Sequence, residues 1–137
     1  MKLFIDTWGW VALADRQERV HAEATEIFQR ARRSGGATTT NFILDETFTL
    51  LFKRRPFEEA WNFSTSLVQS LSIHVEEVTA ARFSKTLELR KRFADKPNIS
   101  FTDLSTMAVM MELGISDILT ANEHFTHVGL AFHVLPH

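Results

Sequence analysis

The sequence contains no cysteine, which excludes a disulfide framework and any zinc site built on thiolate ligands. It also lacks an apolar run close to the roughly 20 residues that a helix needs to cross a bilayer. The apolar segment Leu3-Phe4-Ile5 is followed at once by Asp6, so it is too short for a signal peptide. A cytoplasmic protein with no membrane segment is therefore the expectation.

Glycine and proline are also scarce, and no stretch of the chain resembles a linker, a repeat or a low-complexity tract. The 137 residues are enough to bury roughly two-thirds of the surface that the unfolded chain exposes. With 12 phenylalanines and 3 tryptophans, the composition favours a packed core over disorder. We therefore expect one domain over residues 1–137.

A strong excess of either charge is missing too, because 15 Lys and Arg face 17 Asp and Glu. The protein as a whole is thus not an obvious ligand for a polyanion. The basic residues nevertheless form three clusters, Arg30/Arg32/Arg33, Lys53-Arg54-Arg55 and Arg90-Lys91-Arg92. Cations at helix ends suit the helix dipole, which is the simplest interpretation of each cluster. If the chain binds nucleic acid, we expect Lys53, Arg54 and Arg55, with Arg90, Lys91 and Arg92, to supply the contacts.

Apolar and polar patterning predicts strands that alternate with helices along the chain. Strands are expected at residues 1–5, 37–40, 72–75, 115–120 and 132–135. Helices are expected at residues 7–15, 19–33, 41–55, 79–95 and 100–113, with a further helix that begins at Pro56. Asn41 is expected to cap the third helix. This alternation predicts an α/β fold, a three-layer α/β/α sandwich with a central, mostly parallel sheet.

Four polar residues fall where such a sheet places its ligands. Asp6 and Asn122 directly follow two expected strands, and Asp103 and Glu46 lie in the first and second turns of two helices. Strand ends and helix starts share one edge of an open α/β sheet, so all four side chains can converge there.

Each of these residues also has a purely structural interpretation. Asp6 can cap the helix that follows it, and Asp103 completes a capping box with Ser100. Asn122 can be a turn residue after a strand, with Glu123 beside it as a substitute oxygen donor. Glu46 is expected on the apolar side of its helix, where a carboxylate needs a partner.

Two other acids are expected to lie elsewhere. Asp45 is expected to face solvent, and Asp117 to start a strand at the opposite edge of the sheet.

Three or four hard oxygen ligands at one cleft suit Mg²⁺ or Mn²⁺, which accept phosphate oxygens from a substrate. Repulsion among carboxylates raises their pKa values unless a cation neutralises them. A bound metal lowers the pKa of a water and orients it for attack on phosphorus. Glu46 or Asp103 can then take the proton from that water.

With these residues laid out, the chain resembles a PIN-domain nuclease, in particular the VapC-type toxin of a VapBC toxin–antitoxin pair. The resemblance covers nearly all of the chain and depends on the order and spacing of four short motifs. They are Phe4-Ile5-Asp6-Thr7, Leu44-Asp45-Glu46-Thr47, Phe101-Thr102-Asp103-Leu104 and Leu119-Thr120-Ala121-Asn122-Glu123-His124-Phe125.

The resemblance implies that Asp6, Glu46 and Asp103 are metal ligands, with Asn122 at a fourth position that is often Asp in the family. It implies that Thr120 orients a ligand or the metal-bound water. The implied activity is Mg²⁺-dependent endonucleolytic cleavage of RNA that leaves 3′-hydroxyl and 5′-phosphate ends. Homodimers and a small antitoxin that blocks the cleft are implied as well.

Several other classes of protein fit the sequence less well. A dehalogenase-like phosphotransferase needs an acid at the position of Trp8, and a receiver domain needs an acceptor Asp where Glu76 and Glu77 stand. A histidine metal site would use residues of unsuitable spacing: His124, His127, His133 and His137. The remaining alternative is a catalytically weakened PIN-like module that binds RNA or protein, for which the missing charge at Asn122 is the support.

Two further expectations concern binding surfaces. Trp10 is expected in the core or a dimer contact, while Trp8 is a candidate for stacking on a base. Residues 56–95 are expected to expose an apolar face for a dimer or antitoxin contact.

Overall fold

The computed structural model describes residues 1–137, in which five strands and seven helices follow one another along the chain. The strands are β1 (Leu3–Ile5), β2 (Ala37–Thr40), β3 (Ile73–Glu76), β4 (Asp117–Leu119) and β5 (His133–Leu135). The helices are α1 (Thr7–Ala14), α2 (His21–Arg33), α3 (Asn41–Arg54), α4 (Phe57–Gln69), α5 (Ala80–Arg92), α6 (Phe101–Leu113) and α7 (His124–His127).

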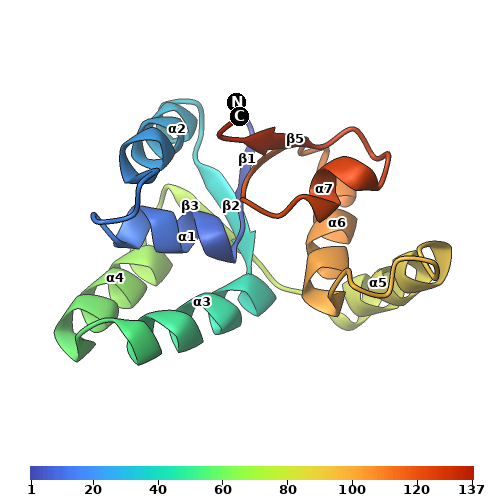
Figure 1. Ribbon diagram of the computed structural model, residues 1–137, viewed down its shortest axis with the longest axis horizontal. Helices are drawn as coiled ribbons and strands as arrows, with labels where there is room; N and C mark the ends of the chain where they lie inside the picture. Colours follow the sequence, from blue (N-terminus) through green and yellow to red (C-terminus); the bar gives the residue numbers. More distant parts are fainter.

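All five strands are parallel and lie in the order β3-β2-β1-β4-β5. The chain first moves outward from β1 to β3, and then returns past β1 to β4 and β5. Because such crossovers are right-handed, the reversal of direction places α1–α4 on one face of the sheet and α5–α7 on the other. Figure 1 shows these two groups of helices on opposite sides of the strands. The predicted three-layer α/β/α fold is confirmed.

The reversal makes β1 and β4 neighbours at the topological switch point of the sheet. Their register pairs Ile5 with Leu119, and the Asp6 backbone N–H donates to the Leu119 carbonyl at 3.2 Å. The next residue on each strand is Asp6 on one side and Thr120 on the other. Open α/β sheets bind their ligands at this place, in the crevice beyond the carboxyl ends of the strands.

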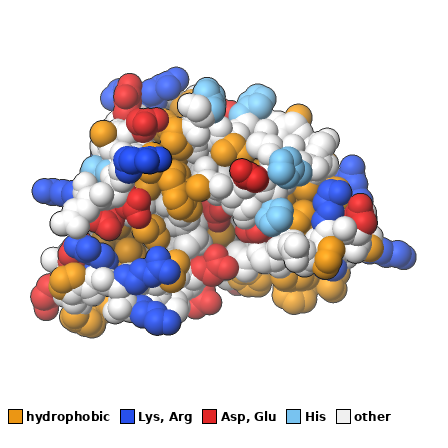
Figure 2. Space-filling view, viewed as in Figure 1, with side chains coloured by type: hydrophobic (Ala, Val, Ile, Leu, Met, Phe, Trp, Pro, Cys, Tyr) orange, Lys and Arg blue, Asp and Glu red, His pale blue; other side chains and the backbone are white.

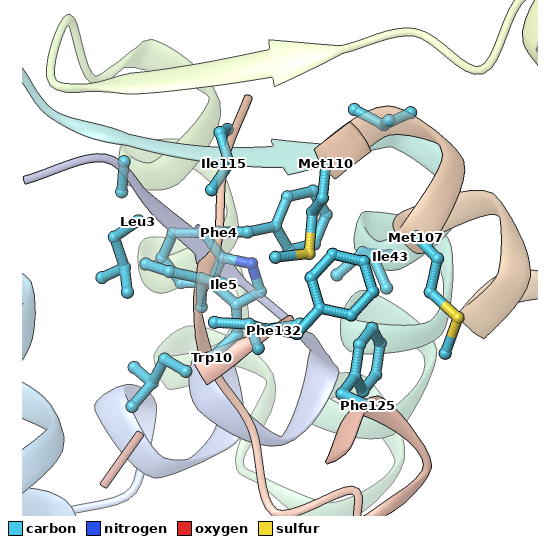
Figure 3. Close-up of a cluster of buried hydrophobic side chains, with 14 of the residues drawn as sticks. Leu3, Phe4, Ile5, Trp10, Ile43, Met107, Met110, Ile115, Phe125 and Phe132 are labelled. Carbon is cyan, nitrogen blue, oxygen red and sulfur yellow. The ribbon is translucent and has the colours of Figure 1, made fainter. Parts of the chain in front are cut away.

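The position of β1 in the middle of the core explains why it consists of apolar residues alone. Leu3, Phe4 and Ile5 are all buried because helices cover both faces of β1. Figure 3 shows Phe4 and Ile5 among residues of the surrounding elements, including Met107 and Met110 of α6. Burial of this apolar surface is the main driving force for placing the helices on the sheet.

Gly9 allows α1 to lie directly against the end of β4. A Cβ atom at this position would come within 2.6 Å of the Leu119 carbonyl oxygen and 2.9 Å of the Ile5 side chain. No real Cβ atom tolerates such a distance, so any larger residue would push α1 away from the strand. The close approach fixes the start of α1, and with it Asp6 and Thr7, over the β1–β4 edge.

The structure corrects the predicted roles of two residues at helix starts, Asn41 and Pro56. Asn41 does not cap α3: the N-cap is Thr40, whose hydroxyl accepts from the Ile43 N–H at 3.2 Å. The Asn41 side chain instead accepts from the Val78 N–H at 2.7 Å and ties α3 to the segment before α5. Pro56 is the N-cap of α4 and not its first residue, because its ψ of 143° is extended.

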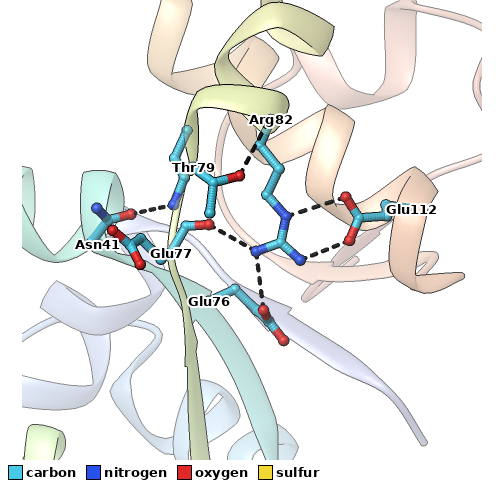
Figure 4. A network of polar contacts seen from close by, with 7 residues as sticks. Asn41, Glu76, Glu77, Thr79, Arg82 and Glu112 are labelled. Atoms are coloured by element: carbon cyan, nitrogen blue, oxygen red, sulfur yellow. Dashed lines mark hydrogen bonds and ion pairs between the residues drawn. The ribbon is translucent and has the colours of Figure 1, made fainter.

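Arg82 of α5 links this helix to the edge strand β3 and to α6. Figure 4 shows its guanidinium between Glu76 at the end of β3 and Glu112 on α6, with the Glu77 carbonyl as a third acceptor. The contact with Glu112 is bidentate, at 3.2 and 2.7 Å, and it raises the pKa of Arg82 and lowers that of Glu112.

None of the helices combines the length with the apolar character that crossing a membrane requires.

We expect Arg82→Met to lower the free energy of unfolding by about 1–3 kcal/mol, because several charge-assisted hydrogen bonds are lost at once. Urea unfolding followed by circular dichroism measures this change. Lys85→Met is the matched control, since Lys85 forms only an exposed pair with Glu88 and should cost less than about 0.5 kcal/mol. Equal losses in the two variants would contradict the role given to Arg82.

Candidate active site

Asp6 is the buried centre of the candidate site, with 6% of its surface exposed. One carboxylate oxygen accepts from the Thr7 N–H at 2.8 Å, which makes Asp6 the N-cap of α1. The other oxygen accepts from the Thr120 hydroxyl at 2.8 Å. The strand register explains this second contact, because Asp6 and Thr120 follow paired residues of β1 and β4.

The pKa of Asp6 is raised from 3.8 to about 6, chiefly because burial disfavours the charged carboxylate. The hydrogen bonds from Thr120 and Thr7 work in the opposite direction and lower it. Repulsion from the nearby carboxylates of Asp103 and Glu46 raises it further. Asp6 therefore lies in an acidic environment whose charge no side chain of this protein compensates.

Glu46 reaches the same region from α3. Its carboxylate accepts from the Thr7 hydroxyl at 2.8 Å, although the two residues are 39 positions apart in the sequence. The expectation that Glu46 lies among apolar residues is wrong, because its side chain is exposed and the buried positions of α3 are Ile43, Leu44, Thr47 and Leu51. Asp45 is exposed, as predicted.

Asp103 and Asn122 meet through a hydrogen bond between their side chains. The Asn122 Nδ2 donates to an Asp103 carboxylate oxygen at 2.8 Å, and the Asn122 Oδ1 accepts from the His124 N–H at 2.9 Å. The Asn122 backbone N–H donates to the Thr120 hydroxyl at 3.0 Å. A continuous chain of hydrogen bonds thus runs from Asp103 through Asn122 and Thr120 to Asp6. Ser100 caps α6 by accepting from the Asp103 N–H, as the capping-box pattern predicts.

The structure brings all five predicted site residues to one edge of the sheet. Figure 2 shows acidic side chains set back near the middle of the face, with histidine side chains on the α7 side. No three Asp, Glu or His side chains converge closely enough to hold one metal ion between them as they stand. None of the carboxylates of Asp6, Glu46 and Asp103 forms an ion pair with a basic side chain.

A sequence model of the PIN domain matches residues 3–130, which include every residue of this edge. The chain belongs to the PIN domain family. A search among curated proteins returned no match.

Two solved structures share the architecture of this PIN domain over nearly its whole length. One is VapC20 of Mycobacterium tuberculosis, a sarcin-ricin loop cleaving toxin, with 29% sequence identity, a TM-score of 0.79 and coverage of 93% of this chain and 95% of that one. The other is VapBC2 of Rickettsia felis, bound to a DNA fragment from its promoter, with 13% identity, a TM-score of 0.77 and coverage of 98% and 97%. The similarity to VapC-type PIN domains expected from the sequence is confirmed.

Sequence reasoning missed the contribution of Thr7 to this PIN domain site. Thr7 donates its backbone N–H to Asp6 and its hydroxyl to Glu46, so it joins two of the carboxylates. Only its position directly after Asp6 could have indicated this. The short helix α7 was also missed, since four residues are too few for a periodic pattern.

The two tryptophans of α1 and the acid Asp117 lie outside the site. Trp10 lies in the core, where its Nε1 donates to the Thr39 hydroxyl at 3.1 Å and its ring meets Phe28 and Phe63 edge-on. Trp8 is half-buried against the same core. Asp117 starts β4 at the far edge of the sheet, as predicted.

The basic clusters lie at the ends of α2, α3 and α5, as the helix-dipole interpretation predicts. Several of their members form contacts within the protein, and the contacts of Arg55 and Arg90 are the most extensive. Arg55 makes a bidentate contact with Glu59 at 3.1 and 3.0 Å, and Arg90 donates to three backbone carbonyls between Phe93 and Ile99. Lys53 and Arg54 are exposed and form no ion pair.

We expect Asp6→Asn to stabilise the protein at neutral pH, because the folded state raises the pKa of Asp6 above its unfolded value. A raised pKa means that ionising Asp6 costs free energy in the fold. This cost is absent below about pH 4 and fully present above about pH 6. Because the pKa rises from 3.8 to about 6, Asp6→Asn should raise the free energy of unfolding at pH 7 to 8 by up to about 3 kcal/mol.

Urea unfolding with EDTA at several pH values from 3.5 to 8 measures this difference. Asp45→Asn removes the same charge from an exposed site on α3 and should change stability little at any pH. A gain for Asp6→Asn that is the same at all pH values would contradict the burial of a charged Asp6.

Proposed function

We propose that this PIN domain is a metal-dependent endoribonuclease and the toxin of a type II toxin–antitoxin pair. The observation that carries the proposal is the buried, raised-pKa carboxylate of Asp6 at the switch point, beside Asp103 and Glu46 and without a basic partner. Such a group is unfavourable for stability, so its presence favours a role in binding or chemistry.

The donor set fits a divalent cation. Asp6, Glu46 and Asp103 offer only hard oxygen ligands, and their mutual repulsion is relieved by a positive ion. Mg²⁺ keeps several of its waters and needs only one or two carboxylates, so a loosely gathered set is sufficient. We propose these three residues as the ligands of Mg²⁺ or Mn²⁺, with Asn122 and Thr120 at the border of the same site.

When bound, the metal supplies charge neutralisation for the phosphate and a water of lowered pKa. The protein's own residues determine the geometry around it. Thr120 and Thr7 hold the two oxygens of Asp6 through bonds of 2.8 Å each, and Thr7 also holds Glu46. Glu46 is exposed at the mouth of the site, so it can accept a proton from an attacking water and release it to solvent.

RNA is the proposed substrate on the strength of the relative with 29% identity, which is described as a sarcin-ricin loop cleaving toxin. If the attacking water displaces the 3′ oxygen from phosphorus, the products carry 3′-hydroxyl and 5′-phosphate ends, and this is the cleavage proposed. The metal, the RNA substrate and the cytoplasmic location expected from the sequence are part of this proposal.

We expect the purified, partner-free protein to cut RNA into discrete fragments in Mg²⁺, and to stop in EDTA. Asp6→Asn and Asp103→Asn should each reduce the rate at least about 100-fold, because even changes outside the ligand shell cost up to that much. Total RNA is the first substrate, and sequencing of the fragment ends names the target. Asp45→Asn is the matched control and should retain the wild-type rate.

An intact protein that binds RNA or a partner but cuts nothing would contradict the nuclease proposal. The catalytically weakened PIN-like module would then be the better description.

Lys53 and Arg54 are the proposed RNA contacts, because both are exposed and unpaired. Lys53 lies two helical turns after Glu46 on the same side of α3, about 10 Å away along the axis. Figure 2 shows basic side chains over α3 beside the acidic centre of the face. A strand that passes over Glu46 can therefore place its next phosphates at these cations.

The double substitution Lys53→Ala/Arg54→Ala should weaken RNA binding and lower the slope of log Kd against log salt concentration by about 1 to 2. Fluorescence anisotropy on the Asp6→Asn background measures this without cleavage. Arg30→Ala/Arg33→Ala, which removes two cations from the last turn of α2, is the control and should leave the slope unchanged. An equal effect of both pairs would show that only net charge matters.

The proposed partners are a cognate antitoxin and a second copy of the chain. A groove between α1, α2 and α4 has a mixed apolar and basic lining that suits a peptide with apolar and acidic side chains; it includes Leu13, Phe28, Phe63, Leu67, Arg16 and Arg32. Residues 56–95 expose apolar side chains as expected, but in two places and not on one face: Phe57, Trp61 and Val68 lie on α4, whereas Phe83 and Leu87 lie on α5 across the sheet, and all are at least 45% exposed. Phe57 and Trp61 stack at 6.0 Å on the outer side of α4. Exposed apolar surface of this kind favours a protein contact.

A further inference from the structure

Asn122 lies beside the proposed metal ligand Asp103, and both ends of its side-chain amide are engaged. The Nδ2 donates to Asp103 at 2.8 Å, and the Oδ1 accepts from the His124 backbone N–H at 2.9 Å. The orientation of the amide follows from the second contact. A backbone N–H can only donate, so the amide oxygen must face it, and the NH₂ group is left for Asp103.

A carboxylate at position 122 could accept from His124 in the same way, but its second oxygen would then face the Asp103 oxygen. Two carboxylate oxygens at 2.8 Å repel each other strongly unless a proton or a cation lies between them. The amide of Asn122 removes this requirement, because its N–H provides the positive end of a dipole at the same point.

We infer that Asn122 is a positioning residue that takes the place of a second cation, so that the site binds one divalent metal ion per chain. It holds Asp103 in place by a hydrogen bond and ties it, through Thr120, to the Asp6 carboxylate. The inference rests on the metal site proposed for Asp6, Glu46 and Asp103. It assigns Asn122 a hydrogen-bonding role toward one ligand and not a place among the ligands.

The test is the number of Mn²⁺ ions bound, measured on the full chain by isothermal titration calorimetry and by electron paramagnetic resonance of free Mn²⁺. We expect one ion per chain for the wild type and two for Asn122→Asp, in which the added carboxylate needs a cation of its own. Asn98→Asp adds the same charge at an exposed position and should still bind one.

A second variant separates positioning from charge. Asn122→Ala removes the hydrogen bond to Asp103 without adding a carboxylate, and it should bind one Mn²⁺ about 10–100-fold more weakly than the wild type. Circular dichroism confirms that each variant is folded. This readout needs no catalytic activity, so it is independent of the choice of RNA.

Two results would overturn the inference alone: two ions bound by the wild type, or one ion bound with wild-type affinity by both Asn122 variants. A wild-type protein that binds no Mn²⁺ at millimolar concentration would overturn the proposed metal site, and the inference with it. RNA cleavage in Mg²⁺ together with either of the first two results would leave the proposed function standing and remove only the role of Asn122.

Discussion

The parallel pairing of β1 with β4 is the constraint on which the rest of the site depends. It sets Ile5 opposite Leu119, so the next residues, Asp6 and Thr120, come into hydrogen-bond contact although 114 positions separate them. The same pairing creates the switch point of the sheet, from which α1 and the loop that carries Asn122 leave on opposite sides. Gly9 keeps α1 close to this edge. A shift of one residue in this register would separate Asp6 from Thr120 and break the chain of hydrogen bonds to Asp103.

The site is organised around threonine and asparagine side chains more than around the acids themselves. Thr120, Thr7 and Asn122 each donate to a carboxylate at 2.8 Å. The Thr120 backbone N–H donates in turn to the Leu135 carbonyl, and the Asn122 Oδ1 accepts from the His124 N–H. Hydrogen bonds of this kind fix the positions of charged groups that repel one another. The arrangement also explains how a buried Asp6 can exist without a basic partner, since the bonds from Thr120 and Thr7 offset part of its burial cost.

Much of this could be predicted from the sequence, because its evidence is local. Short sequence patterns predict the buried strand β1 and the capping role of Ser100, and the alternation of strands and helices predicts the fold class. The predictions that were wrong concern residues whose side-chain partners lie far away in the sequence. Glu46 was expected among apolar neighbours, yet α1 supplies its partner through Thr7, and Thr40 rather than Asn41 caps α3 because Asn41 is drawn to Val78. The orientation of the Asn122 amide depends on the backbone of His124, in a helix too short to recognise.

The lack of a basic partner for Asp6 has a thermodynamic consequence. Any cation that settles beside this carboxylate stabilises the folded state, whether it is a proton, a divalent metal ion or a basic side chain of another protein. These cations compete for one place, so each weakens the binding of the others. Acidity, metal concentration and the presence of a basic partner are therefore linked through one side chain, and the melting temperature of the protein reports all of them together.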